Sequence, residues 1–293
     1  MEKRSVFRSR WLPWALLAPQ GIVISVFFFW PAAQALVQSL QQQDPFGMSV
    51  QWTGLENFSN LWHDPSYLAS FQTTAEFSLL VAGFGIGLSL LLAVFADRVV
   101  RGMLVYRTLL IWPYAVAPAV AGVIWLFLFS PSIGVVAYWL KSIGFDWNSL
   151  LNSRHAMALI VMAAVWKQFS YNFLFFVAGL QSIPRSLIEA AAIDGAGPWR
   201  RFWTIQFPLL SPTTFFLLVI NVVYAFFDTF AIVDAATQGG PGAETSILVY
   251  KVYHDGFKAM DIGGSAAQSV ILMLIVVGLT VVQFRYVEKK VQY

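Results

Sequence analysis

Six long apolar runs separated by polar segments dominate the pattern of the chain. They cover residues 14–36, 74–96, 108–129, 156–180, 212–236 and 262–284. Each run is close to the ~20 residues that an α-helix needs to cross ~30 Å of hydrocarbon. The pattern therefore predicts an all-α integral membrane protein with six transmembrane helices. Pro113 and Pro118 fall inside the third run, so we expect that helix to be kinked.

Composition supports this interpretation. The chain is 58% hydrophobic and only 11% charged, with a mean hydropathy of +0.66, whereas soluble domains carry roughly 25% charged residues. There is no cysteine, which excludes disulfides and cysteine-based metal or nucleophile chemistry. His63, His155 and His254 are far apart in the sequence, so we interpret them as loop residues and expect no metal site.

The first apolar run follows a basic leader that contains Lys3, Arg4, Arg8 and Arg10. A basic start, an apolar stretch and the small residues near position 35 also occur in cleavable signal peptides. The run is longer than the ~7–15 residues of a signal core. We therefore favour an N-terminal segment at residues 1–13 and an uncleaved transmembrane helix at 14–36.

The positions of lysine and arginine predict the orientation in the membrane. Basic residues gather in the leader, in the loop after the second run, between the fourth and fifth runs, and in the tail at 285–293. The loop at 37–73 has none between residues 41 and 70. Because cytoplasmic loops are enriched in lysine and arginine, both termini are expected on the cytoplasmic side and residues 37–73 on the other.

The polar segment between the fourth and fifth runs has clear helix signals. It reads QSIPRSLIEAAAIDGAGPWRRFWTIQFP from residue 181 to residue 208. Pro184 suits the first turn of a helix, and good helix formers follow it. Gly195 and Gly197 can end that helix with a positive φ. Pro198 can open a second short helix and Pro208 can close it.

This segment resembles a known family. Glu189, Ala190 and Ala191 are followed by Gly195, and then by Ile205 and Pro208. The spacing and the place between two spans look like the EAA loop of permease subunits of bacterial ABC importers. The family usually has leucine before the last proline, where this chain has Phe207. The resemblance implies the type I importer permease fold, with a core at 74–284 and a coupling loop at 181–210.

In that family the EAA loop docks on an ATPase subunit. The resemblance implies that the following residues contact it: Arg185, Glu189, Ala190, Ala191, Asp194, Gly195, Arg200 and Arg201. The arginines could instead only fix the orientation in the membrane.

Further partners are implied by the same resemblance. They are an ATPase homodimer, a second six-helix permease subunit and a periplasmic substrate-binding protein, all at a bacterial inner membrane. The chain has no phosphate-binding loop of the Gly-x-x-x-x-Gly-Lys-[Ser/Thr] type and no evident catalytic set. We therefore expect no enzyme and no cofactor on this chain, with ATP and Mg²⁺ on the partner.

Ionisable residues inside membrane spans are costly and often functional. Glu76, Lys167 and Asp228 are the three candidates. Glu76 lies near the outer end of its span and can simply reach the interface. Lys167 and Asp228 lie deeper, at similar depths, where they could contact the solute or pair with each other.

Polar residues share helix faces near these charges. Asn221, Tyr224 and Asp228 are three and four residues apart, which places them on one face. The predicted lining of a solute path is Lys167, Tyr171, Asn172, Asn221, Tyr224, Asp228 and Gln268. The alternative is hydrogen bonding between helices, which is common in membrane bundles.

Within the family, the likeness is greatest to permeases of sn-glycerol-3-phosphate importers. It is carried by SYNFLFF at 170–176, VYAFFDTF at 223–230, SAAQSV at 265–270 and VQFRYVE at 282–288. The resemblance implies sn-glycerol-3-phosphate as solute, with glycerophosphodiesters as further candidates. The residues alone would suit a sugar or oligosaccharide equally well. A scaffold or receptor without transport and a proton-coupled transporter are the alternatives from other classes.

Overall fold

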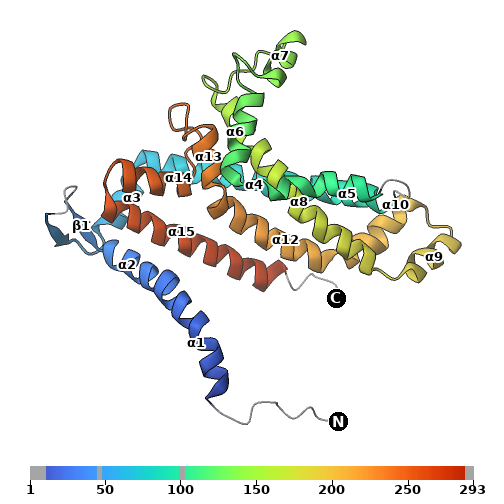
Figure 1. Ribbon diagram of the computed structural model, residues 1–293, viewed down its shortest axis with the longest axis horizontal. Coiled ribbons are helices and arrows are strands. Elements are labelled where there is room, and N and C mark those ends of the chain that lie inside the picture. Colours follow the sequence, from blue (N-terminus) through green and yellow to red (C-terminus); the bar gives the residue numbers. More distant parts are fainter. Residues whose placement is uncertain (1–10, 45–47, 99–102, 288–293) are drawn as a thin grey trace. The chain divides into compact units, whose positions relative to one another are not determined.

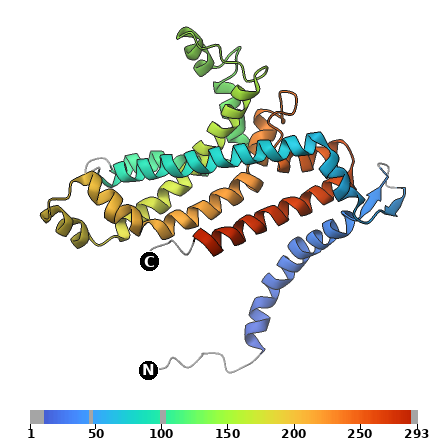
Figure 2. The same cartoon turned by 180° about the vertical axis from the view of Figure 1, so that it is seen from behind.

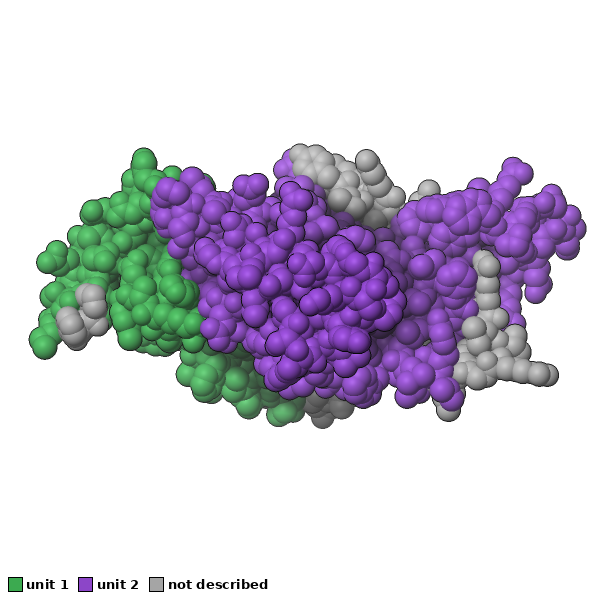
Figure 3. All heavy atoms as spheres, turned by 90° about the horizontal axis from the view of Figure 1, so that it is seen from above, with its two compact units in different colours: residues 1–63, 252–271 green, residues 64–251, 272–293 purple. Residues whose placement is uncertain are grey.

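The computed structural model describes residues 11–44, 48–98 and 103–287. The basic residues of the leader and the end of the tail lie outside these described residues. The membrane orientation that they predict therefore rests on the sequence alone. The chain divides into two compact units. One comprises residues 1–63 and 252–271, and the other comprises residues 64–251 and 272–293 (Figure 3).

The smaller unit contains the first membrane helix and a small sheet. Its helix runs without interruption from Leu12 to Gln38 and contains the predicted run at 14–36. Asn57 holds the segment that follows this helix, because its Nδ2 donates to the carbonyl oxygens of Ser39 and Gln41, both at 2.9 Å. The elements are α1 (Leu12–Ile24), η1 (Ser25–Phe29), α2 (Trp30–Gln38), β1 (Gln41–Gln43), β2 (Val50–Trp52), α3 (Glu56–His63) and η5 (His254–Lys258).

The two strands of this unit pair antiparallel, with Gln41 opposite Trp52. Two helices, α14 (Leu248–Tyr253) and α15 (Ile262–Val282), each contain residues of both units. The boundary between the units falls after residue 251 in α14 and after residue 271 in α15.

The larger unit is a helical bundle. Its elements are α4 (Pro65–Arg98), α5 (Met103–Ile111), η2 (Trp112–Ala115), α6 (Pro118–Leu128), α7 (Val135–Ser142), α8 (Ser153–Ser182), α9 (Arg185–Ile193), α10 (Pro198–Arg201), η3 (Phe202–Gln206), α11 (Phe207–Leu209), α12 (Ser211–Val223), η4 (Tyr224–Asp228), α13 (Phe230–Ala236) and η6 (Gln283–Val287). Helices α4 and α8 run side by side (Figures 1 and 2).

The core of this unit lies where α4, α8 and α12 meet. Its buried members are almost all aliphatic or aromatic, with alanine on α4 where that helix approaches α8. They are Ala93, Ala96, Phe173, Phe176, Val177, Leu180, Ile183, Leu210 and Leu217. In a membrane, small residues such as alanine let helix backbones approach closely, which explains the choice of residues on α4.

The third membrane segment is broken more sharply than a kink. Residues 105–115 and 118–128 form two helical parts with an angle of 104° between them. The prolines explain the break. Pro113 lies in η2, and Pro118 begins α6. Ala117 is extended, with ψ of 142°, as is typical of a residue that precedes proline.

The described residues contain five helices that are long and apolar enough to span a membrane, or six when the bent pair counts as one span. The predicted helical membrane fold class is therefore confirmed apart from the small sheet, and six spans are present when the bent pair counts as one. Boundaries differ at two places. The second helix begins at Pro65, earlier than the expected residue 74, and the fifth reaches Asp228 before a separate helix, α13, continues to Ala236.

Candidate functional site

The polar segment at residues 181–210 folds outside the long helices as two short helices, as the sequence predicts (Figure 1). Helix α9 begins at Arg185 with Pro184 at its N-cap, and α10 begins with Pro198. The second helix continues through η3 and α11 and ends at Leu209, one residue after Pro208, so the sequence located this end to within one residue.

Gly195 ends α9 as predicted. Its φ is +80°, a conformation that costs glycine little. Gly195 N donates to the Ala192 carbonyl oxygen at 3.1 Å, and Ala196 N donates to that of Ala191 at 2.9 Å. These are the two hydrogen bonds of a Schellman motif. Gly197, in contrast, has φ of −64° and caps the start of α10, so only one of the two predicted glycines makes the turn.

The surface of the two helices is open. Glu189, Ala190, Asp194, Arg185 and Arg200 are exposed, whereas Ala191 is half-buried. Large apolar side chains are uncovered beside them: Ile193 is 87% exposed and Trp199 is 75% exposed. An isolated soluble surface seldom gathers such residues without a partner.

Arg201 has a different environment from the other two arginines of the segment. It is half-buried, and its Nη1 donates to the Ile188 carbonyl oxygen at 3.4 Å. It therefore links α10 to α9 and helps to fix the angle between them. Further along the same helix, the rings of Trp203 and Phe207 lie against each other, with centroids 5.0 Å apart.

A hollow of about 760 Å³ lies beneath α9, against the ends of α4 and α8. Its charged residues are Asp97, Arg107, Arg185, Glu189 and Arg201. The Nε and Nη2 atoms of Arg107 are buried and have no hydrogen-bond partner among the described residues. The sequence did not single out Asp97 or Arg107 for this site, because only the fold brings the end of α4 and the start of α5 under α9.

Two of the predicted path residues form a buried pair between helices. The side-chain amides of Asn172 on α8 and Asn221 on α12 exchange two hydrogen bonds, at 3.0 and 2.8 Å. Both side chains are fully buried. Gly85 of α4 lies against them, and a Cβ there would be 3.2 Å from Asn221 Oδ1. This geometry favours the hydrogen-bonding alternative for both asparagines.

Tyr224 is also engaged between helices. Its hydroxyl donates to the Ala164 carbonyl oxygen at 3.2 Å, and the side chain is buried. Ser89 of α4 donates to the Phe169 carbonyl oxygen at 3.0 Å. Together these contacts satisfy polar groups that would be costly to leave unpaired in hydrocarbon.

Lys167 and its neighbours are more open. Lys167 Nζ donates to the Tyr114 carbonyl oxygen at 3.2 Å and lies 5.5 Å from the centre of that ring. Tyr171 lies against the same ring, with centroids 5.8 Å apart. Asp228 is exposed. Lys167 and Asp228 do not form an ion pair within the described residues.

Tyr114 is the residue of this group that the sequence analysis missed. It lies in η2, directly before the break of the third membrane segment, and its carbonyl oxygen accepts from Lys167 of α8. A run of apolar residues with two prolines signals a bend but not its angle, so this contact could not be predicted.

Gln268 belongs to α15 in the smaller unit. Its Nε2 donates to Asp255 Oδ2 at 2.7 Å. Its predicted role in a solute path stays a prediction. Among the described residues no group of three or more histidine, aspartate or glutamate side chains could hold a metal ion.

Comparison with known proteins places these features in context. Residues 83–293 match the family described as "binding-protein-dependent transport system inner membrane component". The chain is 62% identical to the sn-glycerol-3-phosphate transport system permease protein UgpA of Rhizobium meliloti (strain 1021), over 99% of both chains. It is 60% identical to the protein of the same name from Salmonella typhimurium (strain LT2), over 99% of this chain and 98% of that protein.

Solved structures share the fold at lower identity. A chain of a bacterial ABC transporter involved in the import of the acidic polysaccharide alginate has a TM-score of 0.79 at 22% identity, covering 94% of this chain and 96% of its own. A chain of the alginate transporter in complex with an alginate pentasaccharide-bound periplasmic protein has a TM-score of 0.80 at 21% identity, covering 93% and 92%. These likenesses show that the fold is that of ABC importer permeases.

Proposed function

The chain belongs to the family of binding-protein-dependent transport system inner membrane components, and from this premise we propose that it is a permease subunit of an importer for sn-glycerol-3-phosphate. The observation that carries the proposal is the identity of about 60% over the full length with permeases of that solute. Glycerophosphodiesters are further candidate solutes.

The polar segment is the proposed contact with an ATPase subunit. Exposed Glu189 and Ile193 offer a charge and an apolar contact side by side, and Arg201 fixes the angle between α9 and α10. A rigid two-helix segment transmits a push better than a flexible loop. The proposed contact residues are Arg185, Glu189, Ala190, Ala191, Asp194, Gly195, Arg200 and Arg201.

The assembly needs parts that this chain does not supply. We propose that ATP and Mg²⁺ are bound and hydrolysed by a separate ATPase homodimer, and that a second six-helix permease and a periplasmic binding protein complete the importer. Alternating access would follow if ATP binding moves α9 and α10 and thereby tilts the membrane helices. In this arrangement both termini and the polar segment face the cytoplasm.

Lys167, Tyr171 and Asp228 are the proposed solute contacts. A lysine and an aspartate that are not paired with each other cannot face lipid cheaply, so this face requires protein or water against it. The buried Asn172, Asn221 and Tyr224 would support the path from behind rather than touch the solute. Gln268 completes the proposed set.

Reconstitution tests the function directly. The complete complex in proteoliposomes, with binding protein outside and ATP inside, should accumulate labelled sn-glycerol-3-phosphate. A sugar or oligosaccharide is the second candidate, because Tyr114 and Tyr171 form an aromatic surface that suits sugar rings. Uptake and ATPase stimulation by maltose-type sugars, with none by sn-glycerol-3-phosphate, would contradict the proposed solute.

Glu189→Lys tests the coupling contact. The variant should lose the co-purifying ATPase subunit, because a reversed charge on the exposed face of α9 opposes docking. Glu56→Lys is the matched control, since Glu56 is also exposed and lies in the first turn of a helix in the smaller unit. Retention of the ATPase by Glu189→Lys, or its loss from both variants, would count against the polar segment as the docking site.

A further inference from the structure

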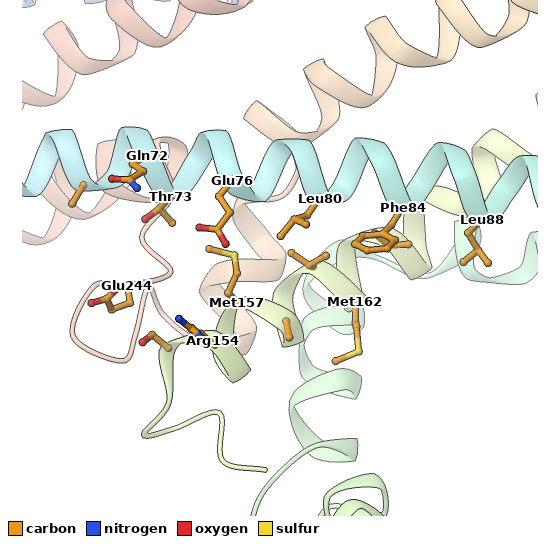
Figure 4. A pocket seen from close by; sticks show the side chains of 15 residues that line it. Gln72, Thr73, Glu76, Leu80, Phe84, Leu88, Arg154, Met157, Met162 and Glu244 are labelled. Carbon is orange, nitrogen blue, oxygen red and sulfur yellow. The ribbon is translucent and has the colours of Figure 1, made fainter. Parts of the chain in front are cut away.

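A second hollow, of about 1010 Å³, lies between α4 and α8 at the end of α8 that is remote from α9. Figure 4 shows three charged side chains at this hollow, from three different elements. Glu76 extends from α4 toward Met157, Arg154 comes from the first turn of α8, and Glu244 comes from the loop between α13 and α14.

These three charges have no side-chain partners among the residues that the structure describes. None of them makes a side-chain hydrogen bond or an ion pair with another described residue; Arg154 bonds only through its backbone N–H, to Asn152. All three side chains are exposed, so their charges are open to a polar group that enters the hollow. One cation with two anions fits a group that itself carries one negative and one positive charge.

The rest of the hollow is apolar and long. Leu80, Phe84 and Leu88 continue along α4 from Glu76, and Met162 faces them from α8 (Figure 4). The helix rise places Leu88 about 18 Å beyond Glu76. Half of the ~30 Å hydrocarbon core is about 15 Å thick. The hollow therefore has a charged end and an apolar trough with the depth of one lipid leaflet.

We propose that this hollow binds one zwitterionic, amine-bearing phospholipid. Its phosphate contacts the Arg154 guanidinium, its ammonium lies between the carboxylates of Glu76 and Glu244, and an acyl chain follows Leu80 and Phe84. Charge complementarity favours this occupant over the anionic solute, because two carboxylates and one guanidinium leave a net negative site that repels a phosphate monoester. The inference does not depend on which solute the importer carries.

Native mass spectrometry of the assembled complex tests the proposal. The complex is purified after equilibration with vesicles of phosphatidylethanolamine and phosphatidylglycerol in equal amounts. The wild-type complex should retain phosphatidylethanolamine in preference to phosphatidylglycerol. Arg154→Gln should lower that retention about tenfold, the loss expected for one charge-assisted contact, and Arg154→Lys should keep most of it.

The carboxylates make a second, independent prediction. Glu76→Gln combined with Glu244→Gln should abolish the preference for the amine lipid without lowering retention of phosphatidylglycerol. The controls are Lys141→Gln on α7 and Glu56→Gln on α3, which remove exposed charges that do not line the hollow and should change nothing. If Arg154→Gln fails to assemble, the double glutamate variant decides the question.

Three results would overturn the proposal. They are equal retention of both lipids by the wild-type complex, unchanged retention by Arg154→Gln, and coverage of the hollow by protein. The last is measurable because the chain has no cysteine. Efficient crosslinking of Leu80→Cys or Ala158→Cys to the second permease subunit would show that a protein helix, rather than a lipid, fills the trough.

Discussion

Asn172 and Asn221 join α8 to α12 through two reciprocal hydrogen bonds in a fully buried environment. Removing one amide leaves the other without a partner, which costs more than removing both. Asn221 also donates to the Leu217 carbonyl oxygen at 2.7 Å, so its orientation is fixed by its own helix as well. Asn221 therefore connects α12 to α8 inside the membrane bundle.

Asn221→Leu should lower the free energy of unfolding by about 1–3 kcal/mol, because Asn172 is left buried and unsatisfied. The double variant Asn172→Leu, Asn221→Leu should cost less than the sum of the two single variants. Thermal unfolding of the purified complex in detergent measures both. Strict additivity would mean that the two amides do not interact in the folded protein.

Lys167→Gln should raise the half-saturating solute concentration for uptake by about tenfold, the effect of losing one charge-assisted contact. Lys167→Arg keeps the charge and should stay closer to wild type. Uptake into proteoliposomes gives the values. Poor assembly of Lys167→Gln with normal uptake by the assembled fraction would instead assign Lys167 to holding Tyr114.

At the residue scale, sequence reasoning identified which polar residues lie in the membrane but not what they contact. Spacing placed Asn221, Tyr224 and Asp228 on one face, yet the first two are buried against α8 while Asp228 is exposed. Whether a polar helix face meets another helix or an open path depends on how the helices pack, and the local sequence pattern does not contain that information.

At the element scale, the turn after α9 requires a residue with a positive φ but does not require a small side chain. A Cβ on Gly195 would meet nothing within 4 Å, and neither would one on Gly197. The two glycines differ in φ, at +80° and −64°. Alanine at either position therefore adds one methyl group without a steric clash, and the two variants differ in the backbone strain that the substitution causes.

Gly195→Ala should weaken the link between the two short helices, because an L-residue in the left-handed conformation costs about 1–2 kcal/mol. Gly197→Ala should be close to neutral. Solute-stimulated ATPase activity of the reconstituted complex is the readout. Equal losses in both variants would show that flexibility, and not the positive φ, is what the segment needs.

Glycine and proline made the ends of the two short helices predictable, but not every glycine or proline there adopts the expected conformation. Gly195 and Pro198 define the two short helices as expected. The second short helix ends at Leu209, one residue after Pro208, whereas Gly197 does not adopt the positive φ expected of it. Local residues indicate where a helix can break, whereas the packing around the site decides whether it does.

For the whole molecule, the orientation in the membrane is open to direct measurement. The chain has no cysteine, so single cysteines can be labelled without background. Ile193→Cys, at a site 87% exposed, should react only with a reagent that reaches the cytoplasmic face. Leu151→Cys, at a site 83% exposed just before α8, should react from the opposite face. The reverse pattern would invalidate the cytoplasmic placement of the polar segment.

The six apolar runs predicted the membrane helices because length and hydropathy are properties of the sequence alone. The division into two units was not predicted, since it joins residues 1–63 with residues 252–271 from the other end of the chain. The hollow between α4 and α8 was missed for the same reason. Glu76 was noticed singly, but Arg154 and Glu244 reach it only through the fold.

The sharp corner in the third membrane segment has a consequence for the life of the protein in the cell. Val116 and Ala117 are extended there, with ψ of 131° and 142°, and Trp112 and Tyr114 beside them are largely uncovered. Non-helical backbone at membrane depth is tolerated only where protein or water covers it. A copy synthesised without its companions would expose this defect to quality-control proteases, so turnover, as well as gene expression, would keep the subunits in balanced supply.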